Sequence, residues 1–211
     1  MTKRFLYVAD PMCSWCWGFA PVIEKIDQEF GEIAPVHVVV GGLRPGTTQA
    51  MRDQDKSYIR DHWNHVQEAS GQPFDFSFFD QEGFVYDTEP ACRATVAARN
   101  LDETKALGFL RHLHKAFYAE NRNTADDNVL VDIAEDFGFP RGEFELTLAS
   151  PETREETQDD FRFAQQSGIT GFPTLFAIED RQPYRVTAGF QKWENLAEPL
   201  TGWVNGTLEL G

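Results

Sequence analysis

Cys13 and Cys16 are separated by two residues in the stretch DPMCSWCWG, which covers residues 10–18. A pair with this spacing can form a reversible disulfide, supply half of a metal site, or simply be buried. A zinc site needs two further ligands. Cys92 and the five histidines form no second pair with ligand spacing. We therefore favour redox chemistry and expect no metal.

The pair lies where a predicted strand meets a predicted helix. Residues 4–9 (RFLYVA) have the apolar, β-branched and aromatic character of a buried strand, and helical spacing of apolar residues begins after Cys13. Unpaired backbone N–H groups at a helix start favour the thiolate of Cys13. The i, i+3 spacing places Cys16 one turn inward, where it can displace whatever Cys13 captures. Ser14 and Trp15, between them, are expected to tune the pair.

The surrounding elements give the fold class. A second apolar strand at 36–40 follows the helix, so the first forty residues predict a βαβ unit with parallel strands. The last sixty residues predict a helix, a β-hairpin and a final amphipathic helix. The order predicts an α/β protein with a thioredoxin fold formed by residues 1–44 and 151–211. Residues 45–150 are predicted to be a large all-helical insertion.

Composition limits the partners and the location. The 211 residues include 34 acidic and 19 basic side chains, a net charge of −15. Nucleic acids and anionic membranes need clustered basic residues, so we expect neither as a partner. The apolar run near the N-terminus is shorter than a secretory signal requires, and no run approaches the length of a membrane span. We therefore expect a cytoplasmic protein.

Over nearly its whole length the chain resembles the DsbA-like thioredoxin-fold oxidoreductases, and in particular their cytosolic, FrnE-like branch. The resemblance rests on three stretches: CSWC at residues 13–16, GITGFPT at 168–174 and YDTEPACRA at 86–94. It implies a thiol–disulfide oxidoreductase without a cofactor. Its substrate would be a protein or small thiol compound, and its redox partner glutathione or a thioredoxin-type protein. It also implies a cis peptide bond before Pro173 and substrate binding by the backbone of Phe172.

Two departures from the family pattern stand out. Many members carry a smaller residue than Phe172, so this side chain is expected to narrow the groove or to stack on Trp15. Thioredoxin has a buried acid on its first strand that helps to deprotonate the second cysteine, whereas Tyr7 or a neighbour occupies the matching place here. We expect Pro11 to turn the nearby Asp10 outward, which leaves the proton acceptor open.

Other interpretations remain. A glutathione-dependent enzyme of the 2-hydroxychromene-2-carboxylate isomerase or kappa transferase type is one, although such proteins carry serine in place of Cys13. A chaperone-like binding module without catalysis is another. Cys92 is expected to be a core residue rather than a second redox thiol. The aromatic-rich segment around residues 74–79 is expected to belong to the core rather than to a partner surface.

Overall fold

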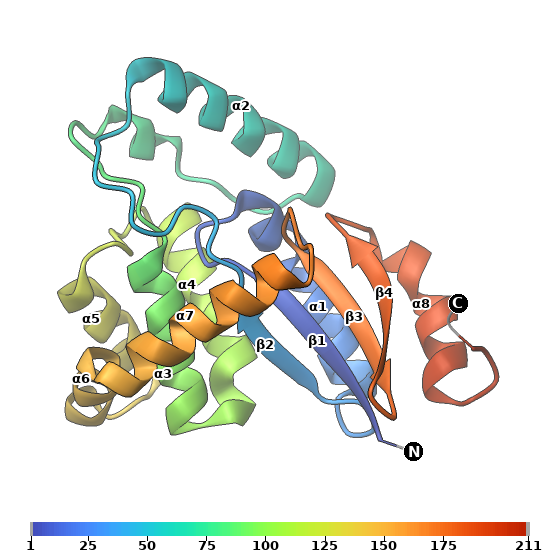
Figure 1. Ribbon diagram of the computed structural model, residues 1–211. Coiled ribbons are helices and arrows are strands. Elements are labelled where there is room, and N and C mark those ends of the chain that lie inside the picture. Colours follow the sequence, from blue (N-terminus) through green and yellow to red (C-terminus); the bar gives the residue numbers. More distant parts are fainter. Residues whose placement is uncertain (1, 210–211) are drawn as a thin grey trace.

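The computed structural model describes residues 2–209 and contains a four-stranded mixed sheet (Figure 1). The strand order is β2-β1-β3-β4, with β1 and β2 parallel and the other neighbours antiparallel. The strands are β1 (Lys3–Ala9), β2 (Val36–Val40), β3 (Thr174–Glu179) and β4 (Gln182–Ala188). This sheet confirms the predicted thioredoxin fold, including the parallel βαβ unit and the C-terminal hairpin.

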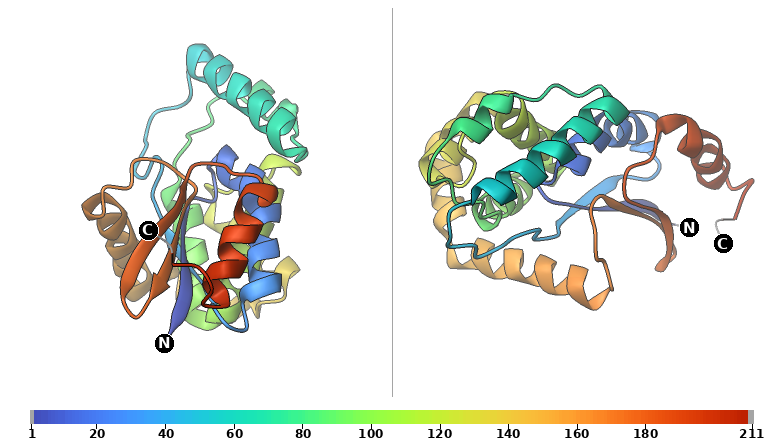
Figure 2. Two further views of the ribbon diagram at one scale, coloured as in Figure 1. Left: turned by 90° about the vertical axis from the view of Figure 1, so that its right-hand side faces the viewer. Right: turned by 90° about the horizontal axis from the view of Figure 1, so that it is seen from above.

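Three helices cover the two faces of the sheet. Seen edge-on, α1 and α8 lie on one face and α7 lies on the other (Figure 2). Their bounds are α1 (Ser14–Phe30), α7 (Pro151–Gln166) and α8 (Trp193–Val204). In α1, Ile23, Ile26 and Phe30 recur at helical spacing and are buried, so this stripe holds the helix on the sheet. The Ser150 hydroxyl accepts a hydrogen bond from the Thr153 N–H at 3.1 Å and caps α7.

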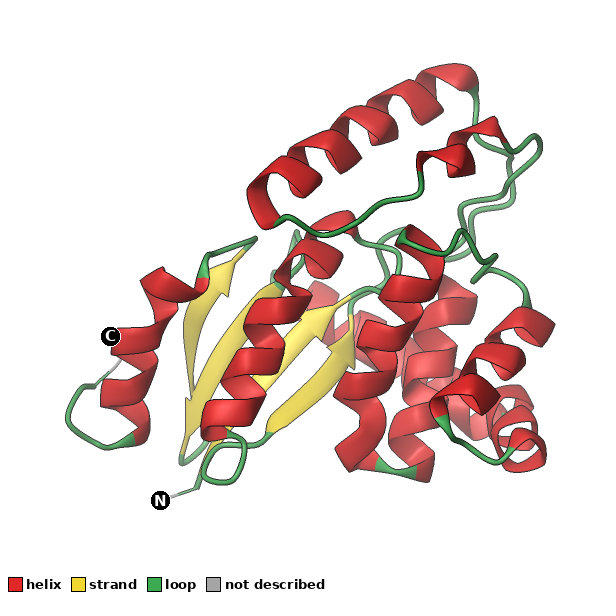
Figure 3. Cartoon of the chain, turned by 180° about the vertical axis from the view of Figure 1, so that it is seen from behind, coloured by secondary structure: helices red, strands yellow, loops and turns green. Residues whose placement is uncertain are grey.

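The chain between β2 and α7 is helical. It contains α2 (Asp53–Ser70), α3 (Glu89–Leu101), α4 (Ala106–Tyr118), α5 (Asp127–Phe137) and α6 (Arg141–Ala149), with short 3-10 helices at Phe76–Asp80 and Glu103–Lys105. From behind, α2 lies beyond the end of the sheet and the other helices stack beside its β2 edge (Figure 3). Within residues 2–209, no helix combines the length and apolar character that a membrane span requires.

Two large apolar clusters fill most of the interior of the described residues, and a third, small one contains Val40, Cys92 and Val96. One lies between the sheet and α1, α4 and α8, and it contains Phe5, Phe19 and Trp203. The other lies beneath α2 and is rich in aromatic rings. Phe78 and Phe79 of the predicted aromatic segment are buried in this second cluster, which confirms their core role. The boundaries at 44/45 and 150/151 stay a prediction, because α4 contributes side chains to both clusters.

Candidate active site

Cys13 is the residue that immediately precedes the first residue of α1. Its backbone is extended, with φ −95° and ψ 114°, and its carbonyl accepts the N–H groups of Cys16 and Trp17 at 3.0 and 3.1 Å. No side chain caps the helix at this position. The sulfur is therefore carried at the positive end of the helix dipole, where free N–H groups favour an anion. The helix begins at Ser14, directly after Cys13, so the predicted place of Cys13 at the helix start holds.

The Cys13 thiol meets the loop that precedes β3. It donates a weak hydrogen bond to the carbonyl of Phe172 at 3.6 Å, and the Phe172–Pro173 peptide bond is cis. The chain thus brings together two predicted motifs that lie 159 residues apart. Ser14, Trp15 and Phe172 line the same cavity as Cys13, whereas Pro173 is buried.

Cys16 lies behind Cys13 and is fully enclosed. Its side chain has no exposed surface, and the cysteines are free thiols. Burial raises the pKa of the Cys16 thiol well above its ordinary value, so this sulfur is protonated near neutral pH. Tyr7 packs in the same cluster, and its buried hydroxyl forms no hydrogen bond within residues 2–209. Cys13 is 6% exposed and lines the cavity, whereas Cys16, one helical turn further on, has no exposed surface and does not line it.

Asp10 points into the protein, so the prediction that Pro11 turns it outward is wrong. The carboxylate accepts hydrogen bonds from the Met12 N–H at 2.8 Å and the Leu43 N–H at 2.6 Å. The Cys92 thiol donates to the same group at 3.4 Å. The bond to Met12 is an Asx turn, in which the side chain folds back onto the backbone two residues on. Burial nevertheless raises the pKa of Asp10, and the two backbone donors oppose that rise.

The turn that carries Asp10 and Met12 is held from the helical segment. The Tyr86 hydroxyl donates to the Met12 carbonyl at 2.7 Å, and His114 Nε2 donates to the Asp10 carbonyl at 3.1 Å. Burial lowers the pKa of His114 to about 4, so the imidazole is neutral at physiological pH. These contacts were not predicted from the sequence, although Tyr86 lies in the YDTEPACRA stretch that carries the family resemblance. The helical segment thereby fixes the approach to Cys13.

A cavity of about 280 Å³ opens beside the Cys13 sulfur. The turn before α1 and the Phe172 loop form its base, and α2 lies above it (Figure 1). Arg44, Tyr58 and His62 complete its wall, and sequence analysis identified none of these three. Trp17 and Phe19 of α1 are both buried in the core and do not line the cavity.

Phe172 occupies space that only glycine leaves free. A Cβ atom at Gly41 would lie 2.0 Å from the Phe172 ring, far inside van der Waals contact. The ring therefore lies against the backbone after β2. Trp15 instead pairs with Phe190, with ring centroids 5.6 Å apart. The large residue before Pro173 is thus accommodated by the absence of a side chain at position 41.

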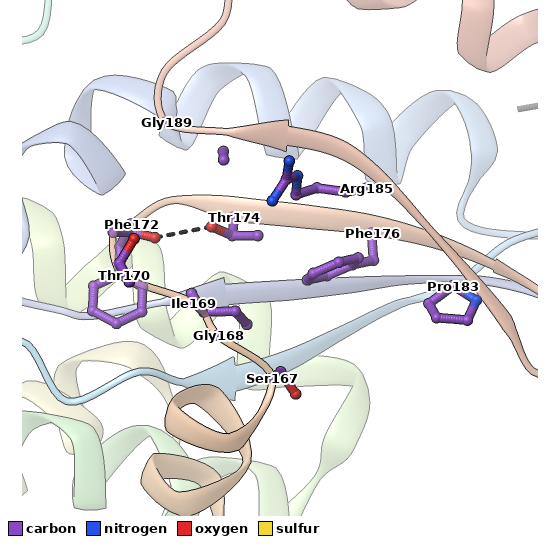
Figure 4. Close-up of a pocket in the computed structure, with 12 residues that line it drawn as sticks. Ser167, Gly168, Ile169, Thr170, Phe172, Thr174, Phe176, Pro183, Arg185 and Gly189 are labelled. Carbon is purple, nitrogen blue, oxygen red and sulfur yellow. Dashed lines mark hydrogen bonds between the residues drawn. The ribbon is translucent and has the colours of Figure 1, made fainter. Parts of the chain in front are cut away.

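A second cavity, of about 520 Å³, lies on another side of the 168–172 loop. Figure 4 shows Phe176 of β3 and Pro183 and Arg185 of β4 on its wall, together with the loop itself. The Thr174 hydroxyl donates to the Gly171 carbonyl at 2.9 Å and stiffens this loop. Neither cysteine of the pair lines this larger cavity. The smaller cavity is therefore the candidate active site.

Known proteins resemble this chain in sequence and fold. The model of the DSBA-like thioredoxin domain matches residues 6–201. A candidate protein disulfide isomerase from Nitrosomonas europaea has a similar structure, with a TM-score of 0.91 and 36% identity over 98% of this chain and 99% of that one. The cytosolic disulfide reductase DsbM from Pseudomonas aeruginosa gives a TM-score of 0.75 and 25% identity over 96% of each chain.

Curated relatives carry a different description. The ClpXP adapter protein SpxH of Bacillus subtilis is 26% identical over 167 residues, which is 79% of this chain and 55% of the relative. The chain therefore spans little more than half the length of the curated relatives it matches. By the extent of the family match, this chain belongs to the family of DSBA-like thioredoxin domains.

Proposed function

We propose that the protein is a thiol–disulfide oxidoreductase that exchanges disulfides with protein or small thiol substrates through Cys13 and Cys16. The observation that carries the proposal is the contrast between the two sulfurs. Cys13 borders an open cavity at a helix start, and Cys16 is enclosed one turn behind it. This arrangement suits a first thiol that attacks and a second that resolves the product.

The proposed reaction needs only the two thiols. The Cys13 thiolate attacks one sulfur of a substrate disulfide, which breaks that bond and releases one substrate thiolate. The Cys16 sulfur then attacks Cys13, forms the Cys13–Cys16 disulfide and releases the second thiolate. Two electrons pass to the substrate, and the two enzyme thiol protons end on the released thiols. Because burial raises the pKa of Cys16, that thiol stays protonated while Cys13 captures the substrate.

Several observations support the choice of substrate and setting. DsbM is described as a cytosolic disulfide reductase, and one of its structures contains GSH. We therefore propose the reducing direction, a cytoplasmic location and glutathione as a redox partner. The Phe172 carbonyl accepts a hydrogen bond from the Cys13 thiol. We propose that the backbone of Phe172 pairs with an extended substrate chain when a substrate binds.

The test compares the wild type with Cys13→Ser and Cys16→Ser in insulin reduction driven by glutathione. We expect Cys13→Ser to abolish turnover. Cys16→Ser should still form a mixed disulfide with the substrate, visible by mass spectrometry, but should release it slowly. Cys92→Ser is the matched control and should keep wild-type rates, since Cys92 does not line the cavity and a serine hydroxyl can donate to Asp10 as the thiol does. Equal activity of Cys13→Ser and the wild type would refute the proposal.

A second candidate function is partner binding without catalysis. It is favoured by the curated relatives, which are named adapter proteins. In that case the double variant Cys13→Ser/Cys16→Ser should still suppress aggregation of a reduced, unfolded model protein as well as the wild type does. Loss of suppression in the double variant would tie binding to the thiols and remove this candidate.

A further inference from the structure

The cavity beside Cys13 has an electrostatic character opposite to that of the whole chain. The protein carries 34 acidic and 19 basic residues, yet no aspartate or glutamate lines this cavity. Its one arginine is Arg44, on the segment that follows β2. A basic group inside a partly enclosed, otherwise acidic surface concentrates the local field and attracts anions.

Arg44 is free to bind a ligand. Among residues 2–209, no carboxylate forms a salt bridge with it within 4.0 Å. The nearby Asp55 is occupied by Arg52, whose Nε and Nη2 donate to its two carboxylate oxygens at 2.8 and 3.0 Å. A guanidinium presents a fork of N–H donors that matches a carboxylate. The unused fork therefore has the chemistry of a carboxylate site.

The position of Arg44 is fixed relative to the reacting sulfur. Its guanidinium lies 5.4 Å from the ring centroid of Tyr86, and the Tyr86 hydroxyl holds the Met12 carbonyl, next to Cys13. The Arg44 backbone is held as well, because its N–H donates to the Thr88 hydroxyl at 3.1 Å and its carbonyl accepts the Thr88 N–H. The Arg44 guanidinium and the Cys13 thiol are thus linked through Tyr86 and the turn at Met12.

Resting on the proposed function, we propose that this site selects small disulfides that carry a carboxylate near the reacting sulfur, and that Arg44 is the group that recognises the carboxylate. The cavity volume of about 280 Å³ is near the lower end of small-molecule sites, which favours a small disulfide over a folded protein loop. Tyr58 and His62 on α2 border the same space and limit its height. The chemistry remains the two-step exchange written above.

The experiment compares small disulfides that undergo the same exchange reaction but carry different charges. The chain is reduced with dithiothreitol, desalted, and mixed with oxidised glutathione (anionic), bis(2-hydroxyethyl) disulfide (neutral) or cystamine (cationic). Fluorescence of Trp15 and Trp17, which flank Cys16, follows a single turnover. Each second-order rate constant is divided by that for the same disulfide with dithiothreitol, so that intrinsic reactivity cancels.

We expect Arg44→Gln to lower the normalised rate with oxidised glutathione about fivefold, as for loss of one partly exposed ion pair, and to leave the neutral disulfide unchanged. Arg44→Glu should reduce the anionic rate further and raise the rate with cystamine. Arg4→Gln is the matched control, because Arg4 is exposed at the start of β1 and does not line the cavity. The difference should shrink in 1 M salt, where screening is strong.

Two results would overturn the proposal. One is equal slowing of all three disulfides by both Arg44 variants, which would mean damage to the site rather than charge selection. The other is an unchanged glutathione rate in Arg44→Glu. Failure of the wild type to react with any of the three disulfides would instead contradict the proposed function, so the two ideas fail in different ways.

Discussion

Helices α2 and α3 both belong to the helical segment but pack in opposite ways. The buried face of α3 consists mainly of small residues, namely Ala91, Ala94, Ala97 and Ala98. At its end, Arg99 donates to the Val38 carbonyl of β2 at 2.9 Å and to Asp160 of α7 at 2.8 Å. Small side chains allow close approach of backbones, so α3 is joined tightly to the sheet.

In contrast, α2 rests on large rings. Its buried residues are Ile59, Trp63 and Val66, and the Trp63 ring lies 4.7 Å from that of Phe79 and 5.1 Å from that of Phe78. These rings hold α2 away from the sheet. The cavity beside Cys13 opens between α2 on one side and the start of α1 and the Phe172 loop on the other. The size of the buried side chains therefore explains why α3 packs closely against the sheet, whereas α2 leaves room for a substrate beside Cys13.

The largest expected effect follows from removing the central ring under α2. Trp63→Ala should lower the free energy of unfolding by about 4 kcal/mol, because a fully buried indole leaves a large cavity. It should also raise KM for disulfide substrates, since Trp63 lines the site. Denaturant titration and steady-state kinetics would measure both. Trp63→Phe keeps an aromatic ring and should lower the free energy of unfolding much less. Equal losses of stability in the two variants would contradict the role of the aromatic packing beneath α2.

An intermediate effect concerns how the stability of the fold depends on pH through His114, the buried residue of α4 that contacts the Asp10 carbonyl. The pKa of His114 is lowered from 6.5 to about 4 in the folded chain. The unfolded chain therefore binds a proton first as pH falls, and the neutral imidazole contributes stability that is present above pH 6.5 and lost on the way to pH 4. This loss amounts to about 3 kcal/mol. Unfolding free energies at several pH values should show it in the wild type and not in His114→Gln. The same dependence of the free energy of unfolding on pH in the wild type and in His114→Gln would refute this prediction.

A smaller effect is expected from crowding α3. Ala97→Leu should lower the free energy of unfolding by about 2 kcal/mol, because a closely packed interface must move to admit the added carbon atoms. Asn64→Leu adds a leucine to the exposed side of α2 and should leave stability unchanged. Thermal unfolding of both variants would check the contrast. A stable Ala97→Leu variant would mean that α3 is packed as loosely as α2.

The parts of the fold that were predicted correctly have local causes. The strand at 4–9 was recognised from a short run of apolar, β-branched and aromatic residues, and the helix after Cys13 from the helical spacing of its apolar residues; both patterns are visible within a short window. The meeting of Cys13 with Phe172 was anticipated only through family resemblance. Asp10 was misplaced because its inward position depends on the Leu43 N–H, more than thirty residues away.

The α2 side of the site escaped prediction for a similar reason. Arg44 follows a glycine pair in a loop, and nothing in its neighbours indicates that Tyr86 would support it. Tyr58 and His62 did offer a cue, because residues four apart on a predicted helix lie on one face. In the structure Tyr58 is 61% exposed, and its ring centroid lies 4.5 Å from that of His62. Aromatic residues on the polar face of a helix can mark a binding surface, but the sequence alone does not say which cavity they border.

The enclosure of two sulfurs has a practical consequence for chemical labelling. Cys16 and Cys92 have no exposed surface, whereas Cys13 borders the cavity. A maleimide added to the native chain should therefore couple at one position without any cysteine being removed by mutation. A dye attached there would lie beneath α2 and would report, through its emission, whenever that helix moves or a ligand enters.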